Sequence, residues 1–224
     1  MPGMAGPAEG VIRFDVEHET RLLEPRVHGE IAALLSAWRE VLARLGLVGR
    51  DPARYQGAGY GNLSARLPPF GDVGRGRRRF LVTGSQTSGI PDLTLEHYCV
   101  VECYDLAGNR VRSLGPIRPS SESLTHGAIY DAAPAARVVM HAHAPEIWRA
   151  ARTLGLPVTR PDAANGTPGM ALEVQRLYRE SQLATTGILA MGGHEDGVIA
   201  FASSPDAAGE TLVRALARAL ALTP

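Results

Sequence analysis

The segment Val138–His143 constrains the fold more than any other part of this 224-residue chain. It reads Val-Val-Met-His-Ala-His, so an apolar run leads into two histidines that are one residue apart. Short apolar runs rich in β-branched residues are typical of buried strands. Alternate residues of a strand point to the same face, with Cα atoms about 7 Å apart. His141 and His143 are therefore expected side by side, where their imidazole nitrogens could converge on one cation such as zinc.

Helical and extended patterns alternate along the rest of the chain. Helices are predicted over residues 27–46, 120–133, from 145 onwards, over 169–183 and over 205–222. Strands are predicted over residues 60–67, 79–82, 98–104, 138–143, 187–191 and 197–201. Interleaved helices and strands in a chain of this length indicate an α/β fold with helices on both faces of a sheet. Residues 16–224 are expected to form one domain, preceded by a loose Gly/Pro-rich tail over residues 1–15.

Lysine is absent from the chain, so its basic side chains are all arginines. A Schiff-base aldolase, a pyridoxal-phosphate enzyme and a Walker-type phosphate loop each need a lysine amine, and these three classes are therefore excluded. Carbon–carbon chemistry through an enolate would instead need a metal ion to stabilise the negative charge.

The formal net charge is zero at pH 7, which argues against nucleic acid and membranes as partners. The arginine-rich run over residues 75–79 lies between a Pro-Pro pair and a predicted strand and is interpreted as a solvated loop. Cys99 and Cys103 are too few for a disulfide scaffold and are expected to be small buried residues. Neither a secretory leader nor a membrane-spanning stretch is recognisable. We therefore expect a cytoplasmic enzyme that acts on a small molecule.

His194 lies in a Gly-rich loop between the last two predicted strands. A loop histidine is usually a surface residue, but loops on a rigid scaffold often carry function. Beside the two strand histidines, His194 becomes a candidate third metal ligand. Three protein ligands would leave a position open for substrate, as in catalytic zinc sites.

Glu122 follows Ser120 and Ser121 at the start of a predicted helix, where a serine can cap the free amide groups. Its carboxylate could simply complement the helix dipole. Alternatively, it could remove or return a proton beside a metal. The serines and the amides at this helix end would also suit a phosphate or carboxylate group.

A turn over residues 59–64 precedes a predicted strand. Its glycine spacing does not fit the dinucleotide-binding pattern, and no helix follows it. Asn62 in this turn can either donate its amide to a ligand or satisfy a buried turn.

Five motifs occur together in the order found in a known family. They are Gly61-Asn62-Leu63-Ser64, Ser88-Gly89-Ile90-Pro91, Ser120-Ser121-Glu122, His141-Ala142-His143 and the late His194. On these residues, the chain resembles the class II aldolase/adducin family over roughly residues 30–220. His126 and Tyr130 also fit the family's pattern, and His126 is interpreted as a packed core histidine rather than a ligand.

The resemblance implies a three-layer α/β/α sandwich with a central mixed β-sheet, a C4-type homotetramer and one zinc ion per subunit. By motif match, His141, His143 and His194 would hold the metal, with Mn²⁺ or Fe²⁺ as alternatives to Zn²⁺. Glu122 matches the family's acid/base carboxylate. The related epimerases usually carry an aspartate there, which favours a lyase. The positions that surround the phosphate in the sugar-phosphate aldolases match Asn62, Ser88, Gly89, Ser120 and Ser121.

Three stretches depart from the family pattern. The turn over residues 83–89 is about three residues longer than the family's phosphate turn, as judged from the motif spacing. The segment between Pro157 and Gly169 is shorter and lacks a clear counterpart of a substrate-facing tyrosine. Glu195 and Asp196 are inserted after His194. The resemblance therefore supports the predicted metal site well and phosphate recognition poorly, and it does not identify the substrate.

The leading hypothesis is a metal-dependent, aldolase-type lyase that stabilises an enediolate of a small hydroxy-carbonyl or sugar-derived compound. A dehydratase, a decarboxylase or an iron-dependent oxygenase on the same scaffold is the second. The third is a non-catalytic assembly module of the adducin type, against which the retention of all three histidines and Glu122 argues.

Overall fold

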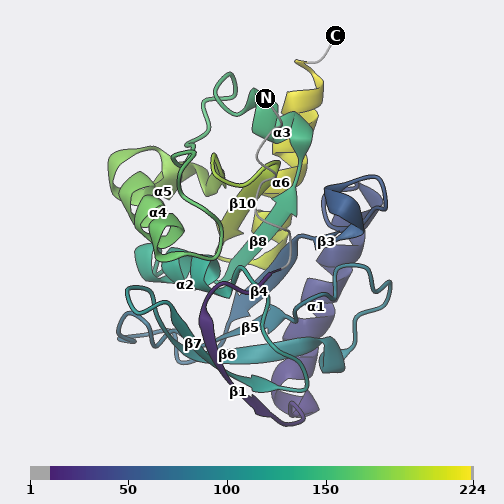
Figure 1. The fold of residues 1–224 in the computed structure, drawn as a ribbon, viewed down its shortest axis with the longest axis vertical. Coiled ribbons are helices and arrows are strands. Elements are labelled where there is room, and N and C mark those ends of the chain that lie inside the picture. Colours follow the sequence, from purple (N-terminus) through teal and green to yellow (C-terminus); the bar gives the residue numbers. More distant parts are fainter. Residues whose placement is uncertain (1–10, 223–224) are drawn as a thin grey trace.

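A computed structural model describes residues 11–222 and shows an eight-stranded mixed sheet with helices on both faces (Figure 1). The strand order is β1-β7-β6-β5-β4-β8-β10-β9, and every neighbouring pair is antiparallel except β1 with β7. The strands are β1 (Asp15–Thr20), β4 (Asn62–Arg66), β5 (Phe80–Thr83), β6 (Tyr98–Asp105), β7 (Arg110–Gly115), β8 (Val138–His143), β9 (Ile188–Ala190) and β10 (Gly197–Ala202). A separate ladder pairs β2 (Gly49–Arg50) with β3 (Gly59–Tyr60). The predicted α/β class with a central mixed sheet is confirmed.

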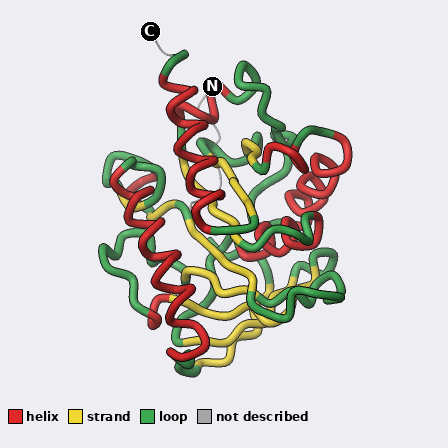
Figure 2. Tube along the Cα trace, turned by 180° about the vertical axis from the view of Figure 1, so that it is seen from behind, coloured by secondary structure: helices red, strands yellow, loops and turns green. Residues whose placement is uncertain are grey.

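The sheet separates two hydrophobic cores, each covered by its own helices. One core is covered by α1 (Pro25–Arg44), α3 (Pro145–Ala150) and α6 (Pro205–Leu220). Figure 2, seen from behind, shows the two longest of these helices lying in front of the strands. The other core is covered by α2 (Ser123–Ala132), α4 (Pro168–Glu180) and α5 (Leu183–Thr186). Two short 3₁₀ turns, η1 (Tyr55–Gly57) and η2 (Leu95–His97), complete the elements. Within residues 11–222, no helix has both the length and the apolar character needed to cross a bilayer.

Strand β8 lies in the interior of the sheet, between β4 and β10, and all six of its residues are buried. Its apolar side chains alternate between the cores, because successive residues of a strand point to opposite faces. Val139 joins one core, while Val138 and Met140 join the other. This burial on both faces explains why Val138–Met140 are all apolar rather than alternating with polar residues. The predicted buried strand is confirmed.

The beginning of the described chain differs from the expected tail over residues 1–15. Residues 1–10 of that tail lie outside the described residues. Phe14, however, is buried in the core, and Asp15 starts the edge strand β1. The folded part therefore begins before residue 16.

Candidate metal centre and adjoining pocket

Three buried histidines meet at the end of β8. One ring nitrogen each of His141, His143 and His194 lies within 4.8 Å of the other two. The ring centroids are 4.7–5.1 Å apart, and the Nε2 atoms of His143 and His194 are separated by 3.0 Å. The structure thus brings together the two strand histidines and the loop histidine that the sequence singled out.

Glycine makes room for the loop histidine. Gly197 pairs with His143 across the β8–β10 ladder, and a Cβ atom there would lie 2.5 Å from Cδ2 of the His194 ring. A Cβ on Gly193 would lie 2.2 Å from the carbonyl oxygen of Ala163. A side chain at Gly197 would collide with the His194 ring, and one at Gly193 would collide with the backbone of Ala163, so both glycines help to seat His194 where it lies.

The environment of His141 suits a metal ligand. Its Nδ1 lies 3.3 Å from the side-chain amide nitrogen of Asn62. No described residue offers a hydrogen-bond partner to its buried Nε2, although buried polar atoms in proteins are nearly always paired. Burial, together with the nearby His143 and His194, lowers the pKa of His141 well below 6.5. The ring is therefore neutral at pH 7, which is the form that binds a metal. Three buried imidazoles, one of them neutral and with an unpaired nitrogen, fit a divalent cation that favours nitrogen ligands.

Glu122 is buried directly before α2, with 1% of its surface exposed. Its Oε2 accepts a hydrogen bond of 2.9 Å from the Thr125 hydroxyl, and its backbone N–H points to the Ser120 hydroxyl at 3.4 Å. The helix therefore begins at Ser123 rather than at Ser120 as predicted. The serines precede the helix, and their side chains remain available to a neighbouring pocket.

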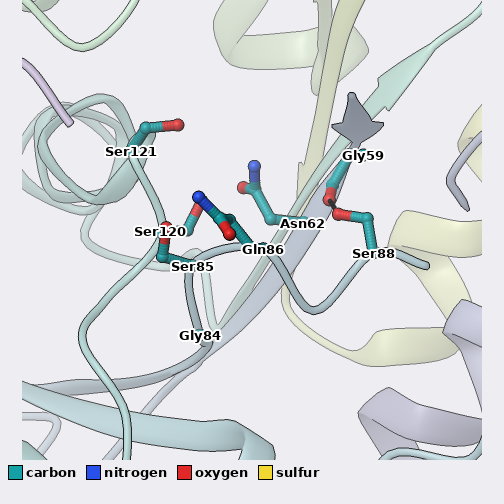
Figure 3. A pocket seen from close by; sticks show the side chains of 9 residues that line it. Gly59, Asn62, Gly84, Ser85, Gln86, Ser88, Ser120 and Ser121 are labelled. Atoms are coloured by element: carbon teal, nitrogen blue, oxygen red, sulfur yellow. Dashed lines mark hydrogen bonds between the residues drawn. The ribbon is translucent and has the colours of Figure 1, made fainter. Parts of the chain in front are cut away.

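That pocket is lined by hydroxyl, amide and backbone groups, with no charged side chain among its described lining residues (Figure 3). The space between these residues is about 280 Å³, counting the part that is open to solvent. The lining consists of Gly59, Gly61, Asn62, Gly84, Ser85, Gln86, Ser88, Ser120 and Ser121. The pocket can thus offer several hydrogen bonds to a polar or anionic group without an ion pair.

Four of the five residues predicted to bind substrate line this pocket, namely Asn62, Ser88, Ser120 and Ser121. Gly89 does not. It lies against the side chain of Arg50, whose Cδ would be 3.0 Å from an added Cβ. The Ser88 hydroxyl donates to the carbonyl of Gly61 at 2.9 Å.

Sequence reasoning did not assign the lining glycines Gly59, Gly61 and Gly84 to the site, and it missed the two further lining residues with polar side chains, Ser85 and Gln86. Both belong to the lengthened turn over residues 83–89, and Gln86 adopts a left-handed backbone with φ 61°. The extra length of this turn, compared with the family pattern, is the sequence feature that could have indicated these two residues.

The pocket adjoins the histidine cluster through Asn62. This residue lines the pocket, pairs with His141 in the β4–β8 ladder and contacts the His141 ring. Ser121, another lining residue, immediately precedes Glu122. A ligand in the pocket would therefore lie beside His141 and beside the segment that carries the buried carboxylate.

His126 is not one of the three clustered histidines, although it lies near enough to His141 to help lower the pKa of that residue. It is fully buried, and its Nδ1 is 2.7 Å from the Ser64 hydroxyl. That hydroxyl is in turn 2.7 Å from the hydroxyl of Tyr130. Burial lowers the pKa of His126 to about 3. The residue is thus a neutral, hydrogen-bonded part of the core.

Comparison with known proteins agrees with this arrangement. Residues 51–223 match the model of the class II aldolase and adducin N-terminal domain, which is more than half of the chain. The chain belongs to this family. A search of the curated proteins found no match.

Several solved structures share the fold at low sequence identity. L-fuculose-1-phosphate aldolase from Thermus thermophilus is 22% identical, with a TM-score of 0.59 over 87% of this chain and 93% of that one. A sugar-phosphate aldolase from Thermotoga maritima is 17% identical, with a TM-score of 0.64 over 88% and 98%. YgbL from Klebsiella pneumoniae, for which an aldolase, epimerase or decarboxylase activity is suggested, is 18% identical, with a TM-score of 0.62 over 88% and 89%. The α/β/α architecture predicted from the motifs is therefore confirmed.

Proposed function

We propose that this family member is a metal-dependent, aldolase-type lyase that acts on a small hydroxy-carbonyl or sugar-derived compound. The convergence of His141, His143 and His194 is the observation that carries the proposal, because such a nitrogen set can hold a divalent cation. Zn²⁺ is the ion that we propose, with Mn²⁺ and Fe²⁺ as alternatives, since selectivity follows geometry and metal availability as well as affinity.

Each group in the site has a role in this proposal. A cation bound by the three histidines would polarise the substrate carbonyl and spread the negative charge of an enediolate. Glu122 exchanges the proton on the carbon next to that carbonyl, acting as general acid and base. The Thr125 hydroxyl holds the carboxylate of Glu122 in place at the start of α2. Asn62 and the pocket serines bind the polar end of the substrate.

The test is a panel of hydroxy-aldehydes and hydroxy-acids, with and without phosphate, assayed on the metal-loaded protein. We expect an aldehyde or ketone product from carbon–carbon cleavage. Loss of carbon dioxide or water in place of that product would instead identify a decarboxylase or a dehydratase on the same scaffold. A full chain that stays metal-free in zinc-replete medium would overturn the proposal and favour the non-catalytic module.

Glu122→Gln tests the acid/base role. We expect this variant to bind metal like the wild type and to lose about 100-fold or more in turnover, the usual scale of general acid–base catalysis. Glu146→Gln is the matched control, because Glu146 is also a carboxylate near a helix start, in the first turn of α3. Its turnover should not change. Near-normal turnover in Glu122→Gln would reject the role given to Glu122.

We also propose that the chain assembles as a C4-type homotetramer. The support is its membership of the family and its resemblance to the tetrameric members. A solution mass equal to one chain, measured by light scattering on the metal-loaded protein, would contradict this assembly.

A further inference from the structure

Two tyrosine rings pack against the metal-site histidine His143. The ring of Tyr55 lies edge-on to the His143 imidazole, with centroids 4.7 Å apart and an interplanar angle of 72°. The ring of Tyr60 lies 5.5 Å from the same imidazole and 5.2 Å from Tyr55. Together with the other two histidines, these rings surround the His143 side chain and restrict its rotation.

The hydroxyl of Tyr55 links His143 to the loop that carries His194. It donates to Oδ2 of Asp196 at 2.7 Å. Asp196 is buried two residues after His194, and its carbonyl accepts the backbone N–H of Ala144, the residue after His143, at 2.8 Å. Side chain and backbone of Asp196 therefore both connect the His194 loop with the end of β8.

Arg54 anchors the other side of the Tyr55 hydroxyl. Its Nη2 donates to that hydroxyl at 2.8 Å and to the carbonyl of His143 at 3.3 Å. Its Nη1 donates to the Tyr60 hydroxyl at 3.2 Å, and the guanidinium lies 4.5 Å from the centre of the Tyr60 ring. Arg54, Tyr55, Tyr60 and Asp196 thus form one connected group, here named the Tyr55 clamp.

The backbone of the clamp is held in an unfavourable conformation. Tyr55 has φ 47°, its neighbour Gln56 has φ 57° and Asp196 has φ 60°. Residues other than glycine rarely occupy this left-handed region, and they persist there only where the surrounding structure imposes it, as at ligand clamps and active sites. The hydrogen bond from Tyr55 to Asp196 thus joins two residues that both have this strained backbone. A loop that only connected two elements would not need such strain.

We propose that the Tyr55 clamp positions the rings of His143 and His194 for metal binding, with Tyr55 as the central positioning residue. The inference rests on the proposed metal site. Groups behind the ligands of a metal commonly fix ring orientation, and their loss weakens metal binding by about 10–100-fold. Neither Arg54 nor Tyr55 belongs to the motifs that mark the family in this sequence.

The test is a Co²⁺ titration of the chelator-treated full chain, followed by the visible absorption of the bound ion. Tyr55→Phe removes the hydroxyl and keeps the ring. We expect the dissociation constant to rise about tenfold, with an altered absorption spectrum that reports changed ligand geometry. Asp196→Gly, which tolerates the left-handed backbone, should show the same loss. Adding Tyr55→Phe to it should cause little further loss, because both changes break the hydrogen bond between Tyr55 and Asp196 and the double variant loses in addition only the bond from Arg54.

Tyr104→Phe is the matched control. The Tyr104 hydroxyl also donates to a buried aspartate, Asp131, at 2.9 Å, but on β6 and α2. This variant should lose thermal stability and keep the wild-type affinity for Co²⁺. A Tyr55→Phe variant with unchanged Co²⁺ affinity and an unchanged spectrum would overturn the proposed role of the Tyr55 clamp. That result would not contradict the proposed metal site. A wild-type chain that binds no Co²⁺ would overturn the proposed function itself.

Discussion

At the scale of single residues, burial decides the charge of His126. His126 is fully enclosed and has a pKa of about 3 in the folded chain, whereas an unfolded histidine titrates near pH 6.5. Between these two values the unfolded chain binds a proton that the folded chain does not bind. The stability contributed by neutral His126 is therefore complete above pH 6.5 and is lost progressively as the pH falls toward 3.

His126→Asn should make the stability of the metal-free protein less dependent on pH. One pKa unit corresponds to about 1.4 kcal/mol, so from pH 6.5 to pH 5 the wild type should lose about 2 kcal/mol more than the variant. Urea unfolding of both proteins at pH 7 and pH 5 measures this difference. Equal losses in the two proteins would show that His126 is accessible to protons in the folded state.

At the scale of secondary-structure elements, the sequence predicted the helices and strands that a local pattern of apolar residues identifies. Buried β8 and the periodic helix α1 were found because their apolar spacing alone identifies them. The edge strand β1 and its neighbour β7 were missed, because both carry charged residues among the apolar ones. Their parallel pairing joins segments nearly a hundred residues apart, and no local pattern specifies it.

The same distinction holds in the candidate site. A strand repeat places two histidines on one face, so that pair was predictable from the sequence. Nothing in the sequence indicated that Arg54 and Tyr55 pack behind His143, because that contact depends on how a loop folds back over 88 residues of chain, from Tyr55 to His143.

Phe14→Ala tests whether the segment before β1 belongs to the fold. Phe14 is 6% exposed and packs in the core beneath α2 and α4, so its truncation leaves a cavity that typically costs about 3 kcal/mol or more. Val11→Ala is the control, because Val11 is 51% exposed and its truncation should cost less than about 0.5 kcal/mol. Denaturant unfolding measures both. Equal midpoints for Phe14→Ala and the wild type would mean that this segment is dispensable.

At the scale of the whole molecule, the candidate centre lies where three strands of the sheet meet. The end of β8 is flanked by the starts of β4 and β10, with Asn62 opposite His141 and Gly197 opposite His143. A bound ion would therefore connect the middle of the sheet to the loop of His194. Because the three candidate ligands come together only in the folded chain, metal binding should stabilise the whole fold.

Removal of the metal should accordingly lower the thermal unfolding midpoint. At a free metal concentration 100 times the dissociation constant, binding to the folded state alone contributes about 2.7 kcal/mol. Each kcal/mol shifts the midpoint of a protein of this size by about 2–4 °C, so a chelator should lower it by roughly 5–10 °C. His141→Ala should abolish this shift. His18→Ala should keep it, because His18 contacts Ser113 between β1 and β7 and is not part of the cluster. A shift that persists in His141→Ala would place the stabilising metal elsewhere, since truncating a ligand inside the sheet cannot leave the affinity of this centre unchanged.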